Sequence, residues 1–154
     1  MPKTKFSFYN VTNPEVEKSA CRLIEKIFYA NLTLLIIVSD REILDSINKT
    51  LWTFSSKSFI PHASIYDEFP SAHQIIISDN FEESQKYIEN IDVVLYYNNI
   101  TNHPKKDIDR IIYLFPEGEK ELLLNARAKY KELKQDGSEI SYYQQQEDSS
   151  WKQF

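Results

Sequence analysis

Positively charged and aromatic side chains recur at helical spacing near the end of the chain. Arg127, Lys131 and Lys134 fall at positions i, i+4 and i+7, and Tyr130 comes three residues after Arg127. Side chains three and four residues apart share one face of a helix. In a chain of formal net charge −5, this local excess of positive charge stands out. Spacing alone favours the solvated face of an amphipathic helix.

The helix that carries these residues has recognisable start and stop signals. We expect it to open after Pro116, because Glu117, Glu119 and Glu121 suit the positive end of a helix dipole. It should end at Gly137, which can adopt the left-handed conformation that terminates many helices. Apolar residues at helical spacing between these signals predict a buried stripe of Leu122, Leu123, Ala126, Tyr130 and Leu133.

Other patterns that could support chemistry are lacking. The three histidines, His62, His73 and His103, are far apart and do not have metal-ligand spacing. The two glycines, Gly118 and Gly137, are interpreted as helix punctuation, so no glycine-rich phosphate loop follows a strand. No nucleophile-elbow sequence accompanies the serines. The sequence therefore predicts no catalytic residues, no metal site and no cofactor.

Composition is that of a globular chain of 154 residues, with 42% hydrophobic and 27% charged residues. The acidic balance argues against wrapping of nucleic acid, which needs clustered cations. A single cysteine, Cys21, excludes an intramolecular disulfide and is expected to be a small buried hydrophobe. No signal peptide and no apolar run of membrane-spanning length is present, so we expect a cytoplasmic protein that does not bind membranes.

Strand and helix patterns alternate along the chain. Residues 3–11 alternate as a strand, and Asn13, Pro14 and Glu15 are typical of a helix start. Residues 32–38 form a continuous apolar run that is typical of a central strand, and Asp40 is expected to cap the next helix. Further strands are predicted at residues 74–78, 93–97 and 111–115. This order predicts an α/β fold with an open, mostly parallel sheet and helices on both faces.

The expected organisation is a single domain over residues 1–143, with residues 138–143 returning as an edge strand. Residues 144–154 are rich in glutamine and serine and are predicted to be a polar, mobile tail. Within this tail, Trp151 and Phe154 are the candidates to pack back onto the domain.

Four blocks of sequence form a distinctive set: Leu51-Trp52, Ser58-Phe59-Ile60-Pro61-His62, Phe115-Pro116 and Ala126-Arg127-Ala128-Lys129-Tyr130-Lys131. Their most specific parts are the segment from Leu-Trp to Phe-x-Pro-His and the Ala-Arg-x-x-Tyr-Lys helix. In this order and spacing, the blocks resemble the chi subunit of the bacterial DNA polymerase III holoenzyme. The likeness covers nearly the whole chain.

The resemblance implies a non-catalytic accessory subunit of the clamp loader in DNA replication, on a Rossmann-like fold without a nucleotide site. It implies two protein partners: the acidic C-terminal tail of single-stranded DNA-binding protein, and the psi subunit of the clamp loader. DNA would be reached only indirectly, and the chain would be a monomer or, with psi, a heterodimer.

The resemblance also implies a site for the acidic tail, built as an aromatic pocket with a basic rim. Matched residue by residue, the pocket would consist of Trp52, Phe59 and Phe115, and the rim of Arg127, Tyr130 and Lys131, with Lys134 at its edge. Without the resemblance, Trp52 and Phe59 are more typical of a hydrophobic core. His62 is interpreted as part of a structural turn.

A second hypothesis is a degenerate nucleotide-dependent enzyme of helicase or transferase type on the same fold. The lack of a phosphate loop argues against it. Thermal stabilisation by ATP and Mg²⁺, compared with stabilisation by an acidic peptide ending in Pro-Phe, separates the two hypotheses.

Overall fold

A computed structural model describes residues 4–99, 104 and 107–154; Lys3 and His103 lie outside the described residues. The predicted strands and the three predicted long helices are present, and two short strands and a short α-helix add to them. The strands are β1 (Lys5–Val11), β2 (Leu34–Ile37), β3 (Ala63–Ser64), β4 (Ile75–Ser78), β5 (Val93–Tyr97), β6 (Arg110–Pro116), β7 (Glu139–Gln145) and β8 (Trp151–Gln153). The α-helices are α1 (Val16–Tyr29), α2 (Arg41–Thr53), α3 (Phe81–Ser84) and α4 (Lys120–Gln135), and short 3₁₀ helices cover Pro70–Ala72 and Gln85–Asn90.

The described strands form one sheet in the order β3-β4-β2-β5-β6-β1-β7-β8. Every neighbouring pair is parallel except β7 and β8. The predicted α/β fold with a mostly parallel sheet is therefore confirmed. The continuous apolar run that becomes β2 lies in the interior of the sheet between β4 and β5, as its lack of alternation predicts.

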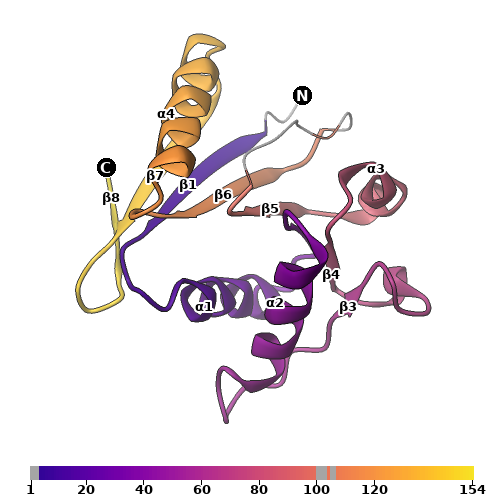
Figure 1. Ribbon diagram of the computed structural model, residues 1–154. Helices are drawn as coiled ribbons and strands as arrows, with labels where there is room; N and C mark the ends of the chain where they lie inside the picture. Colours follow the sequence, from indigo (N-terminus) through magenta and orange to yellow (C-terminus); the bar gives the residue numbers. More distant parts are fainter. Residues whose placement is uncertain (1–3, 100–103, 105–106) are drawn as a thin grey trace.

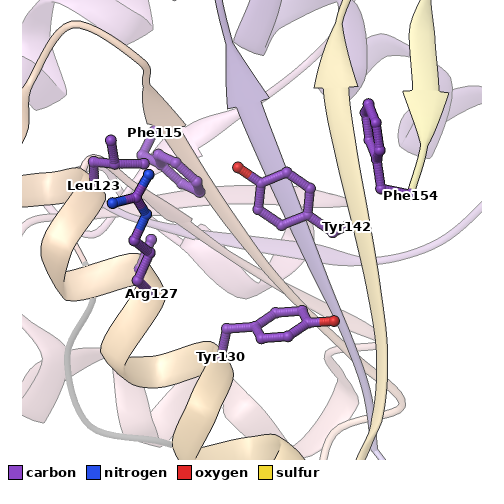
Figure 2. Close-up of a pocket in the computed structure, with 7 residues that line it drawn as sticks. Phe115, Leu123, Arg127, Tyr130, Tyr142 and Phe154 are labelled. Carbon is purple, nitrogen blue, oxygen red and sulfur yellow. The ribbon is translucent and has the colours of Figure 1, made fainter.

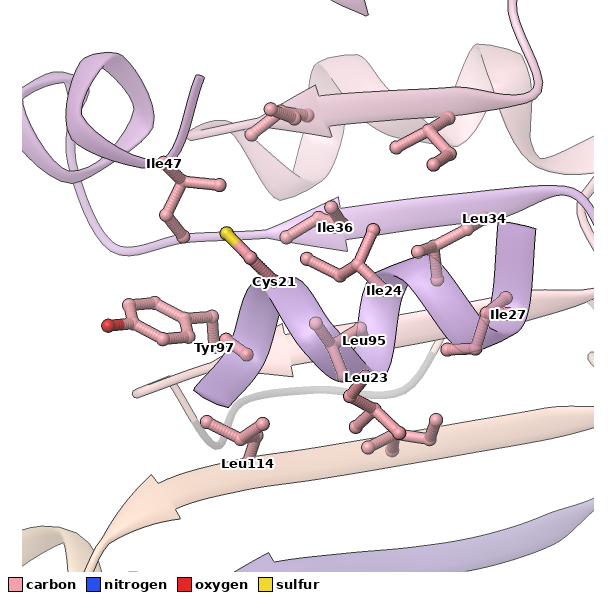
Figure 3. Packing of buried hydrophobic residues seen from close by; sticks show 14 of the residues in the cluster. Cys21, Leu23, Ile24, Ile27, Leu34, Ile36, Ile47, Leu95, Tyr97 and Leu114 are labelled. Atoms are coloured by element: carbon pink, nitrogen blue, oxygen red, sulfur yellow. The ribbon is translucent and has the colours of Figure 1, made fainter. Parts of the chain in front are cut away.

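Helices cover both faces of the sheet, and each face has its own core. Leu34 and Ile36 of β2 pack with α1 and α2, whereas Leu35 and Ile37 pack on the face that carries α4. Figure 1 shows α4 standing on one side of the sheet and α1 and α2 on the other. Figure 3 shows the first of these cores, where Cys21 is buried as predicted. Burial raises the pKa of the Cys21 thiol to about 12.

Local capping chemistry explains where the helices begin and end. The Asp40 carboxylate accepts a hydrogen bond from the Ile43 amide at 2.9 Å, which confirms the predicted N-cap of α2. For α1 the predicted N-cap is wrong, because the helix begins at Val16 with Glu15 as its N-cap, and Asn13 Oδ1 accepts a hydrogen bond from the Glu15 amide and not from an amide inside the helix. At the end of α4, Gly137 has a φ of 74°, and the Ser138 amide bonds back to the Leu133 carbonyl at 3.1 Å.

The C-terminal segment differs from its prediction. Residues 138–143 were expected to form an edge strand and residues 144–154 a mobile tail, but β7 extends to Gln145 and pairs with both β1 and β8. The strand expected at residues 138–143 is therefore present, but it lies inside the sheet and not at its edge, and residues 151–153 of the expected tail form a strand. The reason is a long-range contact: Trp151 packs edge-on against Tyr9, with ring centroids 5.0 Å apart, and brings β8 onto the sheet.

The left-handed conformation at the end of α4 generates a prediction. Gly137→Ala should lower the free energy of unfolding by roughly 1–2 kcal/mol, because a Cβ destabilises this backbone conformation. Urea unfolding followed by circular dichroism measures the change. Gly118→Ala is the matched control, since a Cβ there meets nothing within 4 Å and needs no positive φ. Equal stabilities of the two variants would contradict the role assigned to Gly137.

Candidate functional site

Helix α4 is positioned by the strands on either side of it in the chain. It connects β6 to β7, and both of these strands pair with β1, so α4 crosses over β1. Ala126 and Leu133 are buried beneath it, and Leu122, Leu123 and Tyr130 are half-buried. The predicted apolar stripe of this helix is confirmed. Leu124, at 62% exposure, faces away from it.

A pocket of about 280 Å³ lies between α4 and the strands that it covers. It opens between the first half of α4 and the C-terminal strands, as Figure 2 shows. The lining residues come from β6, α4, β7 and the residue after β8; they are Phe115, Leu123, Ala126, Arg127, Tyr130, Tyr142 and Phe154. Three of the predicted site residues, Phe115, Arg127 and Tyr130, are therefore brought together.

Aromatic rings pack against one another around this pocket. The Phe8 ring of β1 lies 5.6 Å from Tyr130 and 6.5 Å from Tyr142, and the Tyr130 and Tyr142 rings meet edge to face at 6.2 Å. The Tyr142 hydroxyl accepts a hydrogen bond from Asn10 Nδ2 at 3.0 Å. Asn10 is buried at 4% exposure, so this contact holds the Tyr142 ring from below. The apolar walls are thus fixed by packing before any ligand binds.

Cationic side chains on α4 lie along one side of the pocket. Arg127 is exposed and lines the pocket, while Lys131 and Lys134 are exposed and continue the row beyond it. Among the described residues, none of these three side chains forms an ion pair, whereas Lys129 contacts Glu132 at 3.6 Å. Their charges are therefore free to meet an anionic ligand.

Trp52 and Phe59 do not join this pocket, which corrects the expected grouping of site residues. Trp52 lies in α2, on the face of the sheet opposite to α4, next to Leu51 in the core of that face. Its ring is 45% exposed and lies 5.4 Å from the Phe59 ring, which is 68% exposed. Because the sheet separates the two faces, these rings cannot share a cavity with Phe115. They form a second aromatic surface, which we call the Trp52–Phe59 surface.

His62 supports the Trp52–Phe59 surface from below. It is buried, its ring centroid is 4.3 Å from that of Trp52, and its two ring nitrogens contact the carbonyls of Ile60 and Asn48 at 2.7 and 3.1 Å. Burial lowers the pKa of His62, and the two carbonyls oppose this effect. These contacts tie the loop after α2 back to the helix and agree with the interpretation of His62 as part of a structural turn.

Four lining residues were not predicted as site residues: Leu123 and Ala126, which were expected only in the buried stripe of the helix, and Tyr142 and Phe154. Tyr142 was assigned to the sheet without a role, and Phe154 was placed in the tail. A signal for Tyr142 was present, since Ile140 and Tyr142 alternate along β7 and both pack on the α4 face. Phe154 had no local signal, because its position depends on the pairing of β8 with β7.

A second hollow, of about 350 Å³, lies at the carboxyl ends of β2 and β4. Open α/β sheets usually bind nucleotides at this edge. The described residues that line the hollow include Asp79 and Glu82 and no glycine, lysine or arginine. Carboxylates repel phosphate groups, so this lining does not favour the alternative of a nucleotide-dependent enzyme.

Within the described part of the chain, no three or more His, Cys, Asp and Glu side chains gather where they could hold a metal ion. Across those same residues, every helix is too short or too polar to cross a bilayer.

Comparison with known proteins identifies a similar protein and a family whose sequence model matches this chain. A protein from Rickettsia prowazekii (strain Madrid E), named "Probable DNA polymerase III subunit chi", is 40% identical to this chain over 78 residues. The alignment covers 51% of this chain and 47% of that protein, so it spans about half the length of the relative. The sequence model of the family described as "DNA polymerase III chi subunit, HolC" matches residues 3–141. The chain therefore belongs to the DNA polymerase III chi subunit family.

Proposed function

We propose that this chain is a non-catalytic accessory subunit of DNA polymerase III that links the clamp loader to the acidic C-terminal tail of single-stranded DNA-binding protein. The observation that carries this proposal is the pocket between α4 and β7, where Arg127, which has no ion pair within the described part of the chain, lies beside aromatic walls. Family membership supports a role in DNA replication. The link to DNA would be indirect, through the bound protein.

The chemistry of the pocket suits a peptide that ends in an aromatic residue. Phe115, Tyr130 and Tyr142 offer ring edges and faces, and a cavity of about 280 Å³ has room for one aromatic side chain. The Arg127 guanidinium at the side of the cavity can hold a terminal carboxylate through two parallel hydrogen bonds. A ring and a carboxylate on one residue are what a C-terminal phenylalanine provides.

The cation row suits the acidic residues that precede such a phenylalanine. Lys131 and Lys134 follow Arg127 by one and two helical turns and have no ion-pair partner among the described residues. They would meet upstream carboxylates through solvent-exposed contacts, which contribute little individually and weaken with salt. The net charge of −5 disfavours general binding of anions, so recognition would be confined to this row.

The Trp52–Phe59 surface is the candidate for attachment to the clamp loader, through psi where this partner is present. Exposed aromatic side chains are typical hot spots of protein interfaces. The Trp52–Phe59 surface and the pocket are on opposite faces of the sheet. A protein docked on α2 would therefore leave the pocket open, as an adaptor between two partners requires.

The first prediction for this function concerns Arg127. Arg127→Ala should weaken binding of a peptide ending in Asp-Asp-Ile-Pro-Phe by about 1.5–3 kcal/mol, because it removes charge-assisted hydrogen bonds to the carboxylate. Lys134→Ala should cost well under about 1 kcal/mol. Arg127→Lys keeps the charge but loses the two-point contact, so it should fall between wild type and Arg127→Ala. Isothermal titration calorimetry measures all four proteins.

The matched control for Arg127 is Arg22→Ala, which removes one exposed cation from α1 on the opposite face and should leave binding unchanged. Raising the salt concentration should weaken wild-type binding without abolishing it, since burial of the peptide ring is insensitive to screening. Wild-type affinity in Arg127→Ala would show that the tail binds elsewhere. Thermal stabilisation by ATP and Mg²⁺ instead of by the peptide would favour the enzyme hypothesis.

A second prediction separates the two surfaces. Trp52→Ala and Phe59→Ala should each weaken retention of the tagged chain by the clamp-loader assembly of its own cell by roughly tenfold or more, as loss of an interface hot spot does. Peptide affinity should be unchanged in both variants. Arg127→Ala should show the opposite pattern, with retention unchanged and peptide binding weakened. A loss of peptide binding in Trp52→Ala would contradict the assignment of one partner to each face.

A further inference from the structure

The residues after the β7–β8 turn contribute a wall to the pocket that lies across from α4. The Phe154 amide donates a hydrogen bond to the Tyr142 carbonyl at 2.8 Å, which continues the ladder that pairs Gln144 with Lys152 and Tyr143 with Gln153. Residues opposite each other in such a ladder point to the same face of the sheet. Lys152 and Phe154 therefore share the α4 face with Tyr142, and Figure 2 shows Phe154 on the far side of Tyr142 from α4.

This wall is held in place from the opposite face of the sheet. Trp151, one residue before Lys152, packs against Tyr9. The buried Gln145 side chain accepts hydrogen bonds from the amides of Thr12 and Asn13 at 3.2 and 3.0 Å and donates to Ser19 Oγ at 3.1 Å. Both contacts attach the hairpin to β1 and α1 through the face of the sheet opposite to the pocket. The side chains of β8 that point to the pocket face are therefore not needed to anchor the hairpin.

The exposed side chains on the pocket face after the β7–β8 turn are an aromatic ring and a cation, as they are on α4. Phe154 lines the pocket and is 66% exposed, and the Lys152 ammonium lies 5.2 Å from the centre of the Phe154 ring. Within the described residues, Lys152 forms no ion pair. Each side of the pocket therefore offers an aromatic ring with a cation near it: Tyr130 and Arg127 on α4, and Phe154, which lines the pocket, with Lys152 beside its ring.

We propose that Phe154 and Lys152 form a second recognition wall of the pocket, with Phe154 packing on the terminal aromatic ring of the peptide and Lys152 meeting an upstream carboxylate. This inference rests on the proposed function and adds to it the residues that set ligand preference. Phe154 lines the cavity without filling it, since about 280 Å³ remains beside the ring. The wall therefore favours a peptide whose last residue is aromatic over one whose last residue is small.

A double-mutant cycle tests the contact with the peptide ring. Wild type and Phe154→Ala are each titrated with two acidic peptides that differ only in ending in Pro-Phe or Pro-Ala. Phe154→Ala should weaken binding of the Pro-Phe peptide by roughly 3- to 10-fold and binding of the Pro-Ala peptide by less than about 2-fold. Phe154→Leu, which keeps an apolar side chain, should give an intermediate loss with the Pro-Phe peptide.

Lys152→Ala should weaken binding of the Pro-Phe peptide by roughly 2- to 5-fold at low salt, and this difference should vanish at high salt. Gln153→Ala is the matched control, because Gln153 lies between Lys152 and Phe154 in the sequence and points to the other face of the sheet. Its affinity should equal that of wild type. Unchanged melting temperatures in all four variants would establish that the losses come from the pocket.

The outcomes separate this inference from the proposed function. If Arg127→Ala weakens binding and Phe154→Ala does not, the proposal of a second recognition wall is wrong, whereas the proposed binding of the tail in the pocket is retained. Tighter binding by Phe154→Ala would also overturn the inference, because Phe154 would then compete with the peptide for the pocket. If wild type does not bind the Pro-Phe peptide, both the proposed function and the second wall fail.

Discussion

Parallel pairing of β1 with both β6 and β7 determines where the residues of the pocket lie. Since β6 and β7 are successive strands in the chain but flank β1 in the sheet, the connecting helix α4 has to cross over β1. This crossing brings the Phe115, Phe8 and Tyr142 rings beneath one helix face. The hydrogen bond between Asn10 and Tyr142 then fixes the relation between β1 and β7 at the pocket floor.

The sheet also keeps two aromatic surfaces apart. Helices α1 and α2 build one core and α4 builds the other, so Trp52 and Phe59 are separated from Arg127 by the full thickness of the sheet. A protein with two such surfaces can bind two partners without steric conflict, whereas a single pocket that combined all these residues could not. This separation of the two surfaces is what the proposed adaptor role rests on.

The positively charged side chains beside the pocket differ in their ion pairing from several on other surfaces. The chain is acidic overall, yet the cations beside the pocket have no ion-pair partners among the described residues, whereas Lys18, Arg41 and Lys86 are paired with carboxylates on other surfaces. Paired cations contribute little to the field around the protein. Arg127 and Lys152 differ from other cations without an ion pair among the described residues, such as Arg22, in lying beside the apolar pocket, and a small group of cations in an acidic chain favours an acidic peptide over a long polyanion.

The sequence alone determined the features that depend on neighbouring residues. Apolar periodicity identified the three long helices and the strands β1, β2, β4, β5, β6 and β7, but not β3, α3 or β8. Asp40 and Gly137 marked helix ends, and the spacing of Arg127 and Tyr130 placed them on one helix face. The order of strands in the sheet was decided only by the tertiary structure, because pairing joins residues far apart in the chain. That pairing moved Trp52 and Phe59 away from Phe115, turned the expected edge strand into an interior one, and placed Phe154 beside Tyr142. No local pattern around residue 154 predicts its place beside Tyr142. That place follows from the packing of Trp151 on Tyr9, which belongs to β1 at the other end of the chain.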